Sequence, residues 1–260
     1  MVRSARRLLR RKERVQAGEF LAEGRQAVAE ALRRPDVVQD LLVARGAVGR
    51  HQDLLAEAVA AGVPVGSVPD DQLATLSDTV TPQGLLAVCR AVDVSLEEAL
   101  AGSPRLVVLC DQVRDPGNLG TVVRCADAFG ADAVLVSRDS VDLWNAKTVR
   151  ASTGSVFHLP VAVEVDLPTA VARARAAGMA VYGADGGGSD SVEELARTGG
   201  LSRPVLWVMG NEAWGLPPEH ADLVDALVAL PMYGQAESLN LSTAAAVFLY
   251  ATATAQRAGS

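Results

Sequence analysis

The spacing of apolar residues divides the chain into two α/β parts, and the second part has the clearer pattern. From residue 104 onward, short apolar runs of strand length alternate with stretches of helical periodicity. This alternation predicts a mostly parallel sheet with helices on both faces. We expect strands at Leu106–Cys110, Ala133–Ser137, Phe157–Val165, Ala180–Ala184, Val205–Met209 and Ala226–Leu230. We expect helices at Leu119–Phe129, Val141–Ala151, Leu167–Ala177, Ser191–Thr198 and Leu239–Ala255.

The first part of the chain predicts a smaller α/β domain. Residues 4–34 have the pattern of a helix, and Ser95–Pro104 has the composition of a linker. We therefore expect one domain over residues 1–95 and a second over residues 104–260. Between the helix and the linker we expect strands at Val37–Ala44, Val63–Val68 and Gly84–Ala91, and helices at Gln52–Ala61 and Asp71–Asp78.

Charge is distributed unevenly along the chain, whose formal net charge is −7. Residues 1–34 hold ten Arg or Lys against four Glu, a net charge of +6, which leaves −13 for the rest. Arg3, Arg7, Arg10 and Arg14 are spaced by three or four residues, which predicts one shared helical face. This face is either a solvated basic arm or a surface that contacts the phosphates of an anionic partner.

Several function classes are excluded. No apolar run is long enough to span a membrane, and no apolar segment of a secretory signal follows the basic start. The three cysteines are too few and too scattered for a disulfide framework or a zinc site, so we expect a cytoplasmic protein without a metal. The sequence has no P-loop, and the glycines at 117 and 120 lack dinucleotide-binding spacing, which argues against a nicotinamide enzyme.

Three segments that follow predicted strands carry the candidate chemistry. In residues 115–124, Asn118 is expected to cap the next helix, and Arg124 is expected to face away from the core. Residues 209–215 bring a glycine, an amide and a carboxylate together after an apolar strand. Residues 230–240 precede the final helix, with Ser238 as its expected cap. Ligands of parallel sheets bind beyond the carboxyl ends of strands, where all three segments lie.

Together these segments resemble the three motifs of the SpoU (TrmH-like) ribose methyltransferases of the SPOUT class. Asn118 with Arg124 matches the first motif, Gly-Asn-Glu at 210–212 the second, and Leu-Pro-Met at 230–232 with Ser-Leu-Asn at 238–240 the third. Residues 147–154 and 157–160 are also similar to the family. Residues 15–91 resemble the smaller substrate-binding domain of some members, which is similar to ribosomal RNA-binding proteins.

The resemblance implies a trefoil-knotted C-terminal domain that forms a homodimer. The final helix, apolar nearly all round, agrees with burial against the core or a second subunit. The resemblance also implies an S-adenosylmethionine site made largely of backbone groups. The residues at the matching positions are Ala184, Gly210, Leu230, Met232 and Leu239. Leu230 stands where the family usually has Ile.

The implied reaction is methyl transfer to a ribose 2′-hydroxyl of RNA, with 23S ribosomal RNA favoured as substrate. Arg124 either accepts the hydroxyl proton or stays charged and orients the RNA, because guanidinium is normally protonated. The resemblance assigns supporting roles at the reacting centre to Asn118, Glu212, Ser238 and Asn240. Phosphate contacts are expected from Arg150, Arg7, Arg10 and Arg14. A tRNA methyltransferase and a catalytically silent RNA-binding protein are the alternatives, and protection of ribosomes from antibiotics stays open.

Overall fold

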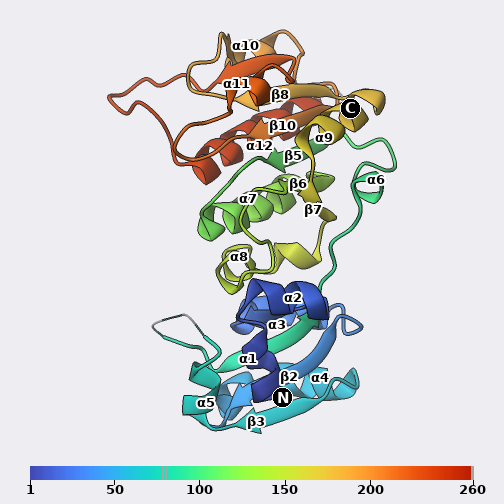
Figure 1. Cartoon of the computed structure of the whole chain (residues 1–260), viewed down its shortest axis with the longest axis vertical. Coiled ribbons are helices and arrows are strands. Elements are labelled where there is room, and N and C mark those ends of the chain that lie inside the picture. The colour runs from blue at the N-terminus through green and yellow to red at the C-terminus, as the bar shows by residue number, and fades with distance from the viewer. Residues whose placement is uncertain (78, 80, 259–260) are drawn as a thin grey trace. The chain divides into compact units, whose positions relative to one another are not determined.

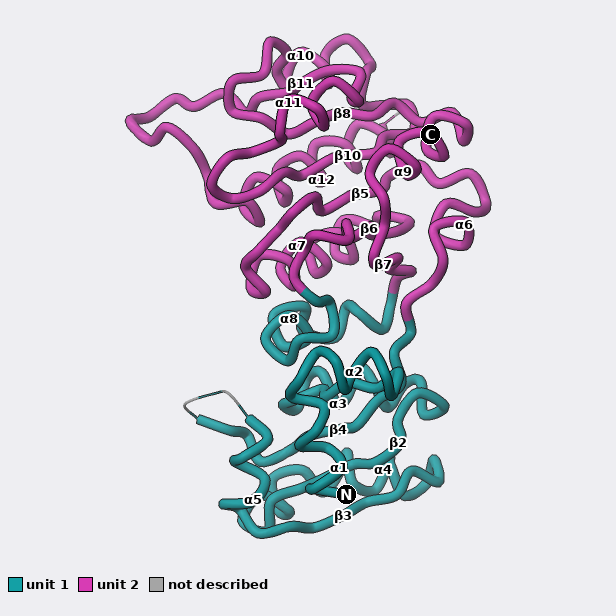
Figure 2. The backbone as a smooth tube through the Cα atoms, in the orientation of Figure 1, with its two compact units in different colours: residues 1–92, 142–158 teal, residues 93–141, 159–260 magenta. Residues whose placement is uncertain are grey.

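The computed structural model describes residues 1–77, 79 and 81–258. The chain forms two compact units, coloured separately in Figure 2. Unit 1 contains residues 1–92 and 142–158, and unit 2 contains residues 93–141 and 159–260. The predicted boundaries assigned residues 142–158 to the C-terminal domain, whereas in the structure this segment packs with the N-terminal one. Its Trp144 and Phe157 rings stack on Phe20, with centroids 4.3 and 5.8 Å away.

Unit 1 is built on a four-stranded sheet of order β1-β4-β2-β3 (Figure 1). β4 runs antiparallel to β1 and β2, and β2 is parallel to β3. The strands are β1 (Glu19–Glu23), β2 (Val38–Ala44), β3 (Val65–Val68) and β4 (Leu85–Arg90). The helices are α1 (Val2–Arg7), α2 (Arg11–Ala17), α3 (Arg25–Leu32), α4 (Gln52–Ala60), α5 (Asp70–Ala74) and α8 (Ala146–Ala151), with 3-10 turns η1 (Arg45–His51) and η2 (Ser155–Phe157).

The single helix predicted over residues 4–34 is wrong. Gly18 ends α2 in the left-handed conformation at φ 64°, which glycine adopts without strain. The next residues then form β1, where Phe20 and Leu21 are fully buried and pair with β4. Gly24, at φ 91°, lets the chain turn into α3. Burial in the sheet outweighs the local helical pattern.

Three other predicted elements are shorter than expected. α5 ends at Ala74, and Asp78, the predicted end of that helix, lies outside the described residues. The helix predicted from Val141 begins only at Ala146, and the strand predicted from Phe157 begins at Val161 because η2 precedes it.

Unit 2 is a seven-stranded sheet of order β7-β6-β5-β10-β8-β11-β9 in which every pairing is parallel. This confirms the predicted parallel sheet. The strands are β5 (Leu106–Cys110), β6 (Ala133–Ser137), β7 (Val161–Val165), β8 (Ala180–Ala184), β9 (Asp190–Ser191), β10 (Val205–Met209) and β11 (Ala226–Ala229). The helices are α6 (Leu96–Ala99), α7 (Pro116–Phe129), α9 (Leu167–Ala176), α10 (Val192–Arg197), α11 (Pro218–Ala221) and α12 (Leu241–Ala258).

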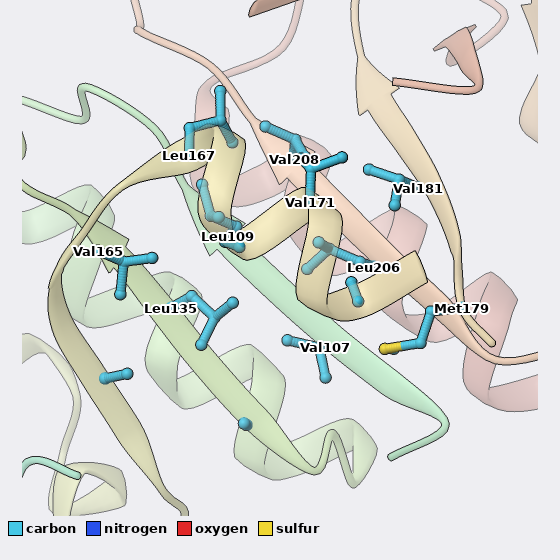
Figure 3. Close-up of a cluster of buried hydrophobic side chains, with 14 of the residues drawn as sticks. Val107, Leu109, Leu135, Val165, Leu167, Val171, Met179, Val181, Leu206 and Val208 are labelled. Carbon is cyan, nitrogen blue, oxygen red and sulfur yellow. The ribbon is translucent and has the colours of Figure 1, made fainter. Parts of the chain in front are cut away.

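Helices cover both faces of this sheet. On one face, Leu206 and Val208 of β10 pack with Val171 of α9 in the buried cluster drawn in Figure 3. Trp207 lies between them in sequence and therefore points to the opposite face. There its ring packs on Phe248 of α12, with centroids 4.4 Å apart. The two apolar layers fix the strand ends from which the site is built.

The final helix is apolar but not wholly buried. Ala245, Phe248 and Leu249 face the core, as predicted. Val247 and Tyr250 lie on another face and are 42% and 60% exposed. α12 therefore presents an apolar surface to solvent in the single chain.

Candidate active site

The loop that follows β10 is a tight turn that closes on itself. The Asn211 and Gly215 backbones exchange two hydrogen bonds, of 2.9 and 3.0 Å. A Cβ at Gly210 would lie 2.5 Å from the Gly215 carbonyl carbon, so a side chain there would displace the turn. The buried Asn211 side chain donates a 2.7 Å hydrogen bond to the Gln112 carbonyl, in the loop after β5. The two strand-exit loops are thus held together.

Glu212, on the same turn, joins the three predicted segments in one hydrogen-bonded network. Its carboxylate accepts hydrogen bonds from the backbone N–H groups of Arg114, at 3.1 Å, and Asp115, at 3.0 Å. It also accepts from the Asn118 side-chain amide at 3.1 Å. Asn240 then donates to the Asn118 side-chain oxygen at 2.9 Å. The structure therefore brings Asn118, Glu212 and Asn240 together.

The network keeps Glu212 ionised. Partial burial opposes its charge, but the hydrogen bonds from Arg114, Asn118 and Asp115 outweigh burial and hold the pKa of Glu212 below its usual value. An ionised carboxylate of low pKa accepts hydrogen bonds well and is a weak base. Glu212 is therefore suited to orienting Asn118 rather than to accepting a proton.

A cavity of about 280 Å³ opens beside this network, at the carboxyl ends of β8, β10 and β11. All five residues predicted to bind the cofactor line it, together with Glu212 and Ser238. Sequence reasoning missed Asp185, Gly186 and Phe248, which also line the cavity. The position of Asp185 directly after the predicted strand β8 was an available signal for it. Phe248 was assigned only to the core helix.

The two predicted helix caps are wrong. Asp115, not Asn118, caps α7, because its side chain accepts a hydrogen bond from the Asn118 N–H at 2.9 Å. Pro116 occupies the first turn of α7, which starts the helix earlier than predicted. At α12, the Asn240 side chain accepts from the Ser242 N–H at 2.9 Å and takes the capping position expected for Ser238.

Similarity to known proteins agrees with this geometry. Residues 105–250 match the SpoU rRNA Methylase family, and residues 1–87 match the MRM3-like substrate binding domain. The chain belongs to the SpoU rRNA methylase family. It is 35% identical over 249 residues to the 23S rRNA (guanosine(2553)-2′-O)-methyltransferase RlmP of Bacillus subtilis, covering 96% of this chain and 94% of the relative.

Solved structures of the family have the same fold. The SpoU methyltransferase AviRb from Streptomyces viridochromogenes, in complex with AdoMet, superposes with a TM-score of 0.84 at 31% identity and covers 100% of this chain and 99% of its own. An AdoMet-bound rRNA methyltransferase from Sinorhizobium meliloti superposes with a TM-score of 0.80 at 32% identity, covering 96% of this chain and 93% of its own.

Arg124, the residue most closely tied to the chemistry by its resemblance to the family, lies apart from this network. It is exposed on α7 and does not line the cavity. Within the described part of the chain, no hydrogen bond or ion pair engages its guanidinium. Its positive charge is therefore open to a ligand.

The arginines of unit 1 that were expected to contact RNA are not arranged as predicted. α1 ends at Arg7 and α2 begins at Arg11, so the four spaced arginines do not share one helical face. Arg14 is buried and donates to the Asp142 carboxylate, at 2.5 and 2.9 Å, and to the Leu8 carbonyl. It therefore supports the fold of unit 1.

The remaining candidates in unit 1 are partly or wholly exposed. Arg7 is paired with Glu13 at 2.5 Å, and Arg150 with the buried Glu23 at 3.0 Å. Arg10 is exposed. Pairing with a carboxylate lowers the charge that Arg7 and Arg150 offer to a phosphate.

No group of three His, Cys, Asp or Glu among the described residues could hold a metal ion. Among the same residues, no helix is both long and apolar enough to cross a membrane.

Proposed function

We propose that this protein transfers a methyl group from S-adenosylmethionine to a ribose 2′-hydroxyl of 23S ribosomal RNA. The observation that carries the proposal is the Asn118–Glu212–Asn240 network beside the cavity at the strand ends. Family membership and relatives named as 23S rRNA 2′-O-methyltransferases support the same reaction.

The cavity suits S-adenosylmethionine in size and lining. Its volume of about 280 Å³ is close to the lower end of small-molecule sites, roughly 300 Å³. Leu230 and Leu239 would provide apolar surface to the bound cofactor, and the glycine backbones at 186, 210 and 215 would let it approach closely. Asp185 and Glu237 provide carboxylates for hydroxyl or amino groups. When bound, the cofactor supplies an electrophilic methyl group.

The protein must then activate and orient the 2′-hydroxyl. As the oxygen forms its bond to the methyl carbon, the sulfur–carbon bond breaks and the hydroxyl proton leaves. Arg124 has two possible roles: it accepts that proton, or it stays charged, binds a phosphate and orients the ribose. Asn118 and Asn240, fixed by Glu212, offer amide groups for hydrogen bonds to the ribose. Ser238, at the cavity wall, is proposed to assist.

We further infer a trefoil knot in unit 2 and a homodimer formed through it. The apolar, exposed Val247 and Tyr250 of α12 support a subunit contact. Residues 1–95 are proposed to bind the RNA substrate, in keeping with the substrate-binding match. A cytoplasmic location is proposed because the RNA of the relatives is ribosomal and all three cysteines are free.

Experiment can distinguish the proposed function from two alternatives, a tRNA methyltransferase and a catalytically silent RNA-binding protein. The relatives named as 23S rRNA methyltransferases favour ribosomal RNA over tRNA, and the intact network argues against a catalytically silent RNA-binding protein. Unmodified 23S rRNA and tRNA transcripts should be incubated with methyl-tritiated S-adenosylmethionine. We expect label in 23S rRNA at one nucleotide whose 3′ linkage resists alkali, as a 2′-O-methyl group requires. Label in tRNA alone, or in neither RNA, would contradict the proposal.

The cofactor site has its own test. Gly210→Val places a side chain against the Gly215 backbone and should displace the turn that borders the cavity. We expect affinity for S-adenosylhomocysteine, measured by calorimetry, to fall at least tenfold while the circular dichroism spectrum stays unchanged. Unchanged affinity would place the cofactor elsewhere.

A further inference from the structure

The large aromatic side chain of Trp214 is exposed to solvent next to the candidate active site. Trp214 is 57% exposed, whereas the other two tryptophans, Trp144 and Trp207, are buried in the cores of their units. Trp214 lies on the turn after β10, between Ala213 and Gly215, which both line the cavity. An exposed indole at this place provides a broad, flat apolar face beside the site of methyl transfer.

The turn that carries Trp214 is held by several hydrogen bonds. Besides the two backbone hydrogen bonds between Asn211 and Gly215, the Asn211 side-chain oxygen accepts from the Ala213 N–H at 2.8 Å. The buried Asn211 side chain also anchors the turn to the loop after β5. Gly215 adopts φ 69°, which holds the sharp bend without strain. A fixed backbone lowers the entropic cost of using Trp214 as a binding group.

An arginine extends from the neighbouring loop. The Arg114 backbone N–H donates a hydrogen bond to the carboxylate of Glu212, and Glu212 precedes Trp214 by two residues. The Arg114 side chain is exposed, and across the described ranges no hydrogen bond or ion pair holds its guanidinium. The two joined loops therefore present an aromatic ring and a cation next to the cavity.

We propose that Trp214 is a stacking platform for a base of the RNA substrate, and that Arg114 contacts a phosphate beside it. This proposal rests on the proposed function. Unpaired RNA bases are recognised by stacking on aromatic rings, and phosphates by the planar fork of arginine. Trp214 and Arg114 lie on two loops that hydrogen bonds join, and an aromatic ring and a cation on joined loops match the base and the phosphate of a single-stranded RNA segment. The ligand class is therefore single-stranded RNA, with the ribose of the target nucleotide directed toward the cavity.

The first test uses the fluorescence of Trp214 itself. A short single-stranded oligoadenylate should be titrated into the full-length protein saturated with S-adenosylhomocysteine. We expect quenching of the solvent-exposed emission, because a stacked base quenches an indole. Trp214→Phe should remove the quenched component and leave the emission of the two buried tryptophans unchanged. Full emission from Trp214 at saturating oligonucleotide, with binding verified by anisotropy, would overturn the stacking role.

The second test separates stacking from structure. In the methylation assay, Trp214→Ala should raise the KM for RNA roughly 5- to 150-fold, the usual effect of losing one stacked base, with S-adenosylhomocysteine affinity within twofold of wild type. Trp214→Tyr, which keeps a ring, should restore most of the KM. Arg114→Gln should raise KM less and flatten its salt dependence.

Other outcomes would assign Trp214 a different role. If Trp214→Ala converts a dimer to a monomer in sedimentation, Trp214 is a subunit contact and the proposal fails. If Trp214→Tyr is as impaired as Trp214→Ala, stacking does not explain the effect. Methylation of rRNA with an unquenched Trp214 would overturn the stacking role alone. Quenching without methylation of any RNA would overturn the proposed function alone.

Discussion

Two arginines of unit 1 and two arginines of unit 2 differ in what surrounds their side chains. In unit 1, Arg14 is 7% exposed and bound to Asp142 and the Leu8 carbonyl, and Arg150 is bound to Glu23. In unit 2, the Arg124 and Arg114 side chains are exposed, and the described residues offer neither guanidinium a hydrogen bond or ion pair. A guanidinium that is buried needs a carboxylate and stabilises the fold, whereas an unpaired exposed one is available to a ligand.

This comparison explains why the most basic segment of the sequence is not the clearest binding surface. The arginines near the N-terminus dominate the charge pattern, yet one of them, Arg14, is buried in unit 1 and paired with a carboxylate. The arginines beside the network in unit 2 lie in a part of the chain with excess acidic residues, and only their surroundings distinguish them.

The largest effect is expected at Arg124. Arg124→Ala removes an exposed side chain from α7, so stability should change by no more than about 0.5 kcal/mol. Methyl transfer should fall about 10²- to 10⁴-fold, because the group that activates or orients the 2′-hydroxyl is gone. Single-turnover methylation and thermal unfolding measure the two quantities. A variant that keeps most of its activity would show that Arg124 is not part of the mechanism.

Arg124→Lys distinguishes the two roles. Lysine loses its proton more readily than arginine but lacks the planar fork. Partial activity that grows with pH would favour proton acceptance at this position. Activity as low as that of Arg124→Ala at every pH would favour bidentate orientation of a phosphate.

At Arg14 we expect a large loss of stability, whereas at Arg124 we expect almost none. Arg14→Ala leaves Asp142 with an unpaired charge and the Leu8 carbonyl without a donor, and loss of one partner of a buried ion pair destabilises by about 3–5 kcal/mol. Urea denaturation should show this loss, and the removal of Asp142 in the Arg14→Ala, Asp142→Ala double variant should recover part of it. A stability equal to that of wild type would mean that Arg14 is a free cation, as its spacing predicted.

How far the sequence predicted the structure also differs between the two units. In unit 2, apolar runs that are buried on both faces alternate with helices, so local pattern and final structure agree at β5, β6, β8 and β10. In unit 1, β1 has its apolar residues inside a stretch of helical spacing, and only its pairing with β4, far along the chain, makes it a strand. The grouping of residues 142–158 with unit 1 also depends on distant contacts, those of Trp144 and Phe157 with Phe20.

The site was predictable as a set of motifs but not as a geometry. The resemblance selected Asn118, Glu212 and Asn240, yet their hydrogen bonds join residues 94 and 122 positions apart, which no local rule predicts. The predictions of the two helix caps were wrong for a related reason. Asp115 and Asn240 are as good N-cap residues as Asn118 and Ser238, and the turn geometry decides between them.

A smaller effect is expected from the exposed arginines of the N-terminal helices. Arg3, Arg6 and Arg10 are exposed, and the described part of the chain holds no hydrogen-bond or ion-pair partner for their side chains. Replacing all three with Gln should weaken RNA binding and reduce the slope of log K against log salt by about 2, near 0.7 for each lost contact with a single strand. Cofactor affinity should not change.

The salt dependence also decides between the two interpretations of this segment. A slope identical to that of wild type would mean that these arginines form only a solvated arm. A matched triple substitution of Arg173, Arg175 and Arg197, which are each paired with a carboxylate in unit 2, serves as the control and should leave the slope unchanged.

The smallest effect concerns the thiol next to Arg124. Burial raises the pKa of Cys89 strongly and, helped by the charges of Glu212 and Asp111, raises that of Cys110 to about 12. Cys125 is only half-buried, and the neighbouring Arg124 opposes the rise in its pKa. Since the thiolate is the reactive form, a disulfide reagent at pH 8 should modify one thiol quickly and the other two only on unfolding. The fast rate should rise with pH, and Cys125→Ser should abolish it. If RNA is bound at Arg124, saturating RNA should slow the fast rate severalfold in the wild type. Equal rates with and without RNA would mean that this face of α7 stays open in the complex, and the unpaired charge of Arg124 would then need another explanation.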